Sequence, residues 1–147
     1  MNLIDANLLL YAYNSATEQH HAARRWIEGV FSSAEPAGLT WVTILAFLRL
    51  ATNPRVFARP LSERDAVTIV DQWLRVPAVR VFDPGPRHWT ILSGLILTGQ
   101  VRGPLMTDAY LAAIAIEHGL VLCTNDKDFT RFDGLRVFNP LIGGPAN

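Results

Sequence analysis

The chain has 147 residues, of which 50% are hydrophobic and 18% are charged. This length suits a single domain with a real core, and this composition excludes an intrinsically disordered chain. Thirteen basic and thirteen acidic residues give a net charge of zero, which argues against a strongly basic nucleic-acid-binding protein. Twelve of the basic residues are Arg, which makes bidentate contacts with phosphate, although the same bias equally fits the base composition of a genome.

The sequence also bears on the cellular compartment. Its single cysteine, Cys123, excludes an intramolecular disulfide framework and a cysteine-based zinc site. No basic residue precedes Arg24, so we expect no signal peptide, and no apolar run approaches the roughly 20 residues that a membrane span needs. We therefore expect a cytoplasmic protein without a membrane partner.

Short apolar strands alternate with amphipathic helices along the chain, which is the pattern of an α/β domain. We expect strands at 1–4, 38–41, 79–82, 120–123 and 136–138, and helices at 19–33, 42–51, 62–75, 88–97 and 108–118. One domain then covers 1–142, and 143–147 form a short flexible tail. The core is expected to hold Trp26, Trp73 and Trp89. Trp41, at the end of a strand, is also expected in the core, with stacking on a base as the alternative.

Four aspartates lie at the ends of these elements. Asp5 closes the first strand, Asp126 and Asp128 follow the fourth, and Asp108 opens the most apolar helix. Ligands of parallel α/β sheets bind outside the carboxyl ends of the strands, so we expect these side chains to gather there. Two carboxylates 4 Å apart repel by about 4 kcal/mol at an effective dielectric constant near 20. A hard divalent cation, Mg²⁺ or Mn²⁺, would relieve this repulsion and could activate water for hydrolysis at a phosphoryl group.

Each aspartate also has a simpler interpretation. Asp108 could be the N-cap of its helix, with Thr107 as the alternative cap, and Asn125–Asp128 could form a solvated turn. Asp5 is harder to explain in this way, because an ionisable group inside an apolar run needs a partner or a role.

The segments around these aspartates resemble the PIN-domain nucleases, and among them the VapC toxins of bacterial toxin–antitoxin pairs. The resemblance rests on Leu3–Leu9, Thr107–Ala113 and Thr124–Phe129. Further similarity over Phe47–Phe57 and Phe138–Leu141 is typical of the VapC branch found in mycobacteria. The resemblance implies a three-layer α/β/α domain with a central parallel sheet of about five strands.

The same resemblance implies a toxin that acts as a Mg²⁺- or Mn²⁺-dependent endoribonuclease. Asp5, Asp108 and Asp126 match the metal ligands of the family, and Asp128 matches a further catalytic carboxylate. Asn7 and Thr124 match polar neighbours that orient ligands or water. The implied partners are a VapB-type antitoxin, an RNA substrate and a second copy of the chain.

One departure from the family leaves a second function open. The family usually carries a glutamate in the helix after the second strand, and the aligned residue here is Ala46, with no acid between Glu35 and Glu63. The chain could therefore bind RNA or an antitoxin with weak or no nuclease activity. Asp5 and Asn7 also loosely resemble the motif of haloacid dehalogenase-type phosphohydrolases, which use an aspartyl nucleophile.

Three arginines flank the turn at Asn53–Pro54 and are candidates to bind RNA phosphates, although each also fits a solvated face. These are Arg49, Arg55 and Arg59.

Overall fold

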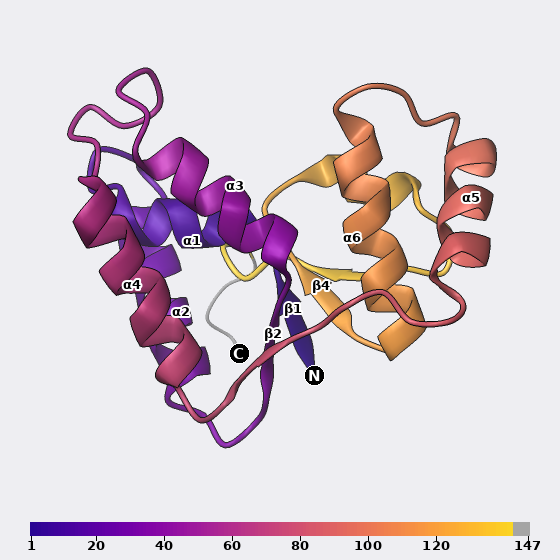
Figure 1. The fold of residues 1–147 in the computed structure, drawn as a ribbon, viewed down its shortest axis with the longest axis horizontal. Helices are drawn as coiled ribbons and strands as arrows, with labels where there is room; N and C mark the ends of the chain where they lie inside the picture. Colours follow the sequence, from indigo (N-terminus) through magenta and orange to yellow (C-terminus); the bar gives the residue numbers. More distant parts are fainter. Residues whose placement is uncertain (143–147) are drawn as a thin grey trace.

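A computed structural model describes residues 1–142, and its centre is a sheet of five parallel strands (Figure 1). The strands follow the order β3-β2-β1-β4-β5, so β1 lies in the middle of the sheet. Each strand has three residues: β1 Asn2–Ile4, β2 Ala37–Leu39, β3 Val79–Val81, β4 Val121–Cys123 and β5 Arg136–Phe138. Four strands lie within one residue of the expected ranges, whereas β2 was expected at 38–41 and ends earlier because Thr40 caps α3 and Trp41 begins it. The expected tail at 143–147 lies outside the described residues.

Within residues 1–142, six α-helices cover the two faces of the sheet. One face carries α1 Ala6–Tyr13, α2 His20–Phe31, α3 Trp41–Ala51 and α4 Glu63–Arg75, and the other carries α5 His88–Gly99 and α6 Leu105–His118 (Figure 1). Successive side chains of a strand point to opposite faces. Accordingly, Ile4 packs in the core beneath α1 to α4, and Leu3 packs in the core beneath α5 and α6. The three-layer α/β/α architecture is thus confirmed.

Helix α4 follows the pattern that its sequence predicts. The Ser62 side chain accepts a hydrogen bond from the Asp65 N–H at 3.1 Å and caps the helix. Ala66, Val70 and Trp73 then form its buried stripe. None of the helices within residues 1–142 is long and apolar enough to cross a membrane.

One helix was not predicted from the sequence, and the start of another differs from the prediction. Helix α1 was not expected, because residues 3–10 form one apolar run in which periodicity does not separate a strand from the helix after it. Helix α6 begins at Leu105, with Pro104 at the cap position. The interpretation of Asp108 as an N-cap is therefore wrong, because Asp108 lies inside the first turn.

The tryptophans also divide differently from the prediction. Trp73 is buried and Trp26 packs partly against the core, but Trp89 is 69% exposed and Trp41 is 54% exposed. The core assignments of Trp89 and Trp41 were wrong. Helix α5 lies at one end of the molecule beside α6 (Figure 1). Trp89 and Leu97 are exposed together with Thr90, Gly94 and Thr98, so the apolar character of Trp89 alone does not place it in the core.

Candidate metal centre

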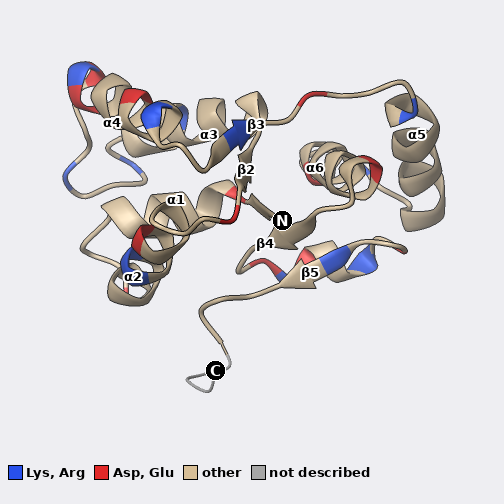
Figure 2. Ribbon diagram, turned by 90° about the horizontal axis from the view of Figure 1, so that it is seen from below, with Lys and Arg blue, Asp and Glu red and all other residues tan. Residues whose placement is uncertain are grey.

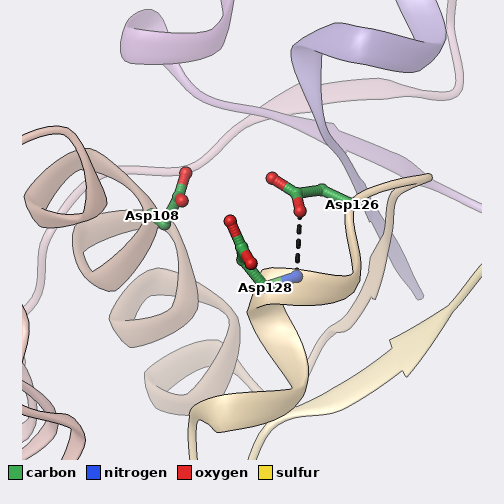
Figure 3. A group of neighbouring side chains, drawn as sticks. All are labelled: Asp108, Asp126 and Asp128. Carbon is green, nitrogen blue, oxygen red and sulfur yellow. Dashed lines mark hydrogen bonds between the residues drawn. The ribbon is translucent and has the colours of Figure 1, made fainter.

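Three aspartates from two elements meet beside the carboxyl ends of the strands (Figure 3). Asp108 comes from the first turn of α6, and Asp126 and Asp128 come from the start of η1, a 3₁₀-helix over Lys127–Arg131 that follows β4. One carboxylate oxygen of each residue lies within 4.8 Å of the corresponding oxygens of the other two. We call these three residues the carboxylate group.

The loop after β4 holds two members of the carboxylate group side by side. Asp126 caps η1, and its Oδ1 accepts a hydrogen bond from the Asp128 backbone N–H at 2.9 Å (Figure 3). This contact uses only one oxygen of Asp126, so its other oxygen and the Asp128 carboxylate remain available to a ligand.

Asp5 lies beside the carboxylate group but is not a member of it. Its Oδ1 accepts a hydrogen bond from the Ala6 N–H at 2.7 Å and caps α1, and its Oδ2 accepts one from the Thr124 hydroxyl at 2.7 Å. Each carboxylate oxygen can accept more than one bond. Asp5 therefore supports the start of α1 and the end of β4 while both oxygens keep a free lone pair.

Thr124 connects Asp5 to the loop that carries Asp126. Its side chain is 1% exposed, and its Oγ1 accepts hydrogen bonds from the Asp126 N–H at 3.0 Å and the Asn7 amide at 3.2 Å. The side-chain Oδ1 of Asn7 in turn accepts a hydrogen bond from the Asn125 backbone N–H at 3.4 Å. Thr124 therefore contacts the Asp5 side chain and the Asp126 backbone, and Asn7 contacts Thr124 and the backbone of Asn125 between them.

Burial and mutual repulsion change the acidity of the aspartates. Burial, followed by the negative charges of Asp5, Asp126 and Asp128, raises the pKa of Asp108 to about 6, and the positive charge of Arg131 opposes this rise. Burial also raises the pKa of Asp5, against the hydrogen bonds from Thr124 and Ala6. Excess negative charge at one place is what a cation would stabilise.

The donor set fits a hard divalent cation. It offers carboxylate oxygens and no sulfur or imidazole, which are the ligands that Mg²⁺ and Mn²⁺ prefer. It is also assembled without a residue from α3, the helix that carries Ala46 in place of the usual glutamate. Ala46 is half-buried in α3.

The candidate RNA-binding arginines lie apart from the carboxylate group. Arg49 is in the last turn of α3, and Arg55 and Arg59 are in the loop between α3 and α4. All three are exposed. This loop lies at the end of the molecule opposite α5 (Figures 1 and 2).

Comparison with known proteins adds the family. The PIN domain family model matches residues 3–135. The chain belongs to the PIN-domain family. Among the relatives of this PIN-domain protein, Ribonuclease VapC37 of Mycobacterium tuberculosis is 41% identical over 140 residues, which cover 95% of this chain and 97% of the relative. Ribonuclease VapC33 of the same species is 39% identical over 141 residues, covering 96% and 99%. The resemblance to VapC proteins is confirmed.

Solved structures agree with the fold. VapC20 of Mycobacterium tuberculosis, described as a Sarcin-Ricin loop cleaving toxin, superimposes with a TM-score of 0.67 at 18% identity, covering 92% of this chain and 99% of that one. A chain of VapBC2 from Rickettsia felis, bound to a DNA fragment from its promoter, gives a TM-score of 0.68 at 14% identity, covering 94% and 97%.

Proposed function

We propose that this protein is the toxin of a toxin–antitoxin pair and acts as a Mg²⁺- or Mn²⁺-dependent endoribonuclease. The observation that carries the proposal is the carboxylate group of Asp108, Asp126 and Asp128 in a PIN-domain chain. Relatives that match almost the whole chain are named ribonucleases, which supports RNA as the substrate.

The chemistry follows from the ligand set. A cation bound by Asp108, Asp126 and Asp128, with Asp5 as a further carboxylate ligand from beside them, would make a bound water more acidic and neutralise charge on a phosphoryl oxygen. Thr124 holds the backbone of Asp126, and the Asp126 side chain holds the backbone of Asp128, so these two ligands are positioned before substrate arrives. No protein nucleophile is required.

The two alternatives from the sequence receive no support. The family model that matches the chain is the PIN domain and the relatives are named ribonucleases, which gives no support to an aspartyl nucleophile at Asp5. The carboxylate group does not depend on α3, so the alanine at position 46 gives no reason to prefer binding without cleavage.

The partners follow from the same relatives. Several solved neighbours are VapBC toxin–antitoxin complexes, so we propose a VapB-type antitoxin for this chain. A basic side chain of that antitoxin would be attracted to the carboxylate group. Homodimerisation and a cytoplasmic location stay predictions.

Sequencing of RNA 5′ ends after induced expression tests the proposed function in cells. We expect new ends at a small number of sites when the wild-type chain is induced and none with Asp108→Ala. Identical end profiles for the two chains, with equal protein levels, would contradict the proposal.

A further inference from the structure

Asn125 lies between Thr124 and Asp126 and joins three parts of the fold. Its Nδ2 donates a hydrogen bond to the Tyr11 hydroxyl of α1 at 3.3 Å, and its Oδ1 accepts one from the Asn139 Nδ2 at 2.9 Å. Asn139 follows β5. Asn125 therefore ties the loop after β4 to a helix early in the chain and to a segment near its end.

The contacts of Asn125 need an amide at this position. Its side chain uses its donor and its acceptor at once, on two different partners. Asn139 also uses both ends of its amide, because its Nδ2 donates to Asn125 and its Oδ1 accepts a hydrogen bond from the Leu141 N–H at 3.0 Å. The side chains of Tyr11, Asn125 and Asn139 are half-buried, so solvent replaces these bonds only in part.

The loop needs such restraints because its acidic side chains repel those of its neighbours. Asp126 and Asp128 lie within 4.8 Å of Asp108, and Asp126 adds to the raised pKa of Asp5. At an effective dielectric constant near 20, one such pair costs about 4 kcal/mol at 4 Å. In the absence of a cation this repulsion acts to move the loop away from α6.

We propose that Asn125, Tyr11 and Asn139 form a clamp that holds the loop after β4 in the position where Asp126 and Asp128 meet Asp108. This inference depends on one part of the proposed function, namely that the carboxylate group binds a divalent cation. The three clamp residues are positioning residues, since they act on the cation through the loop. Without the clamp, part of the free energy of cation binding is used to bring the carboxylates together, and the affinity for the cation falls.

Calorimetric titration of the purified full chain with Mn²⁺ alone tests the clamp. We expect Asn125→Ala to raise the dissociation constant about tenfold, the lower end of the loss seen when outer partners of metal ligands are removed. Asn139→Ala and Tyr11→Phe each remove one contact and should give smaller increases.

Asn53→Ala is the matched control for Asn139→Ala. The Asn53 Oδ1 accepts the Arg55 N–H at 2.9 Å, the same local turn bond that Asn139 makes with Leu141, but Asn53 lies in the loop between α3 and α4. We expect Asn53→Ala to bind Mn²⁺ with wild-type affinity. Wild-type affinity in Asn139→Ala and Tyr11→Phe, or an equal loss in Asn53→Ala, would overturn the clamp. The two single-contact variants decide the question if Asn125→Ala fails to fold.

RNA cleavage separates the clamp from the proposed function. Clamp variants should regain the wild-type kcat at saturating Mn²⁺, whereas Asp108→Asn should not. A kcat that stays low in Asn139→Ala at saturating Mn²⁺ would contradict a role through metal affinity. If the wild-type chain cleaves no RNA, the proposed function fails, while the Mn²⁺ titration still decides whether the clamp exists.

Discussion

Asp108 lies in the first turn of α6, where burial and three neighbouring carboxylates raise its pKa to about 6. A charged residue in this position destabilises the metal-free fold, and the same charge attracts a cation. The charge of Asp108 therefore lowers the stability of the metal-free protein and at the same time favours cation binding.

Asp108→Asn separates the two effects. In EDTA at pH 7.5 the variant should unfold at a temperature roughly 2–4 °C higher than the wild type, the shift that about 1 kcal/mol gives in a domain of this size. The variant should also lose the stabilisation by Mn²⁺ that the wild type shows. Differential scanning calorimetry measures both, and an unchanged response to Mn²⁺ would remove Asp108 from the ligand set.

The raised pKa of Asp108 also predicts a pH dependence. The folded state binds the proton of the Asp108 carboxyl more tightly than the unfolded state does. Protonation of Asp108 therefore stabilises the metal-free fold fully below the ordinary pKa of 3.8, and this contribution is lost as pH rises through about 6. Metal affinity runs the other way, since a proton and a cation compete for the same carboxylate. The affinity for Mn²⁺ should fall about tenfold per pH unit below 6. Calorimetric titrations of the wild-type chain with Mn²⁺ between pH 5 and 7.5 check this, and an affinity that does not change over this range would contradict it.

At the scale of elements, β2 lies between β1 and β3 and requires a residue without a side chain at Gly38. A Cβ there would lie 2.9 Å from the Asn2 carbonyl oxygen and 3.0 Å from the Phe82 ring. Gly38→Ala should therefore lower the free energy of unfolding by about 1–3 kcal/mol. Gly29→Ala in α2, where a Cβ meets nothing within 4 Å, should raise it by about 0.5–1 kcal/mol. Denaturant unfolding of both variants tests the pair.

Local signals in the sequence predict most elements but not the boundaries that matter for the site. The five strands and α4 follow from short apolar runs and a capping serine. Helix α1 does not, because Asp5 both ends a strand and caps a helix within one apolar run. Pro104 was the available signal for the earlier start of α6, since proline favours the first positions of a helix.

The site itself was only partly predictable. Acidic residues at strand and helix ends indicate a cation site, but which of them share it depends on rotamers and loop shape. The sequence therefore did not predict that Asp128, rather than Asp5, shares the carboxylate group with Asp108 and Asp126. Nor did it predict the hydrogen bonds of Asp5 to Ala6 and Thr124. Asn125 and Asn139 were not singled out, because a contact between two amides 14 residues apart leaves no local pattern.

At the scale of the whole molecule, the net charge is zero, but the acidic and basic residues are not evenly distributed. With Asp5, Asp108, Asp126 and Asp128 set apart at the sheet edge, nine acidic residues remain against thirteen basic ones. The loop between α3 and α4 carries Arg55 and Arg59 and no acidic residue, whereas α4 itself carries residues of both signs (Figure 2). An acidic centre that recruits a cation within a mildly basic surface suits an enzyme that acts on RNA.

Arg55 and Arg59, in the loop between α3 and α4, can be used to test whether basic residues away from the carboxylate group bind RNA. The double variant Arg55→Ala, Arg59→Ala should weaken RNA binding and reduce the slope of log affinity against log salt by about 0.7 for each lost phosphate contact. Its kcat at saturating RNA should match the wild type, because neither residue lies in the carboxylate group. Fluorescence anisotropy measures the affinity, with Arg75→Ala at the far end of α4 as the control.

The most direct test of the account is cleavage of RNA by the purified chain with and without a divalent cation. We expect cleavage at internal sites in Mg²⁺ or Mn²⁺, no cleavage in EDTA, and recovery of cleavage when the cation is returned. Asp108→Asn should not cleave under any of these conditions. Cleavage that persists in EDTA, or cleavage by Asp108→Asn at the wild-type rate, would contradict it.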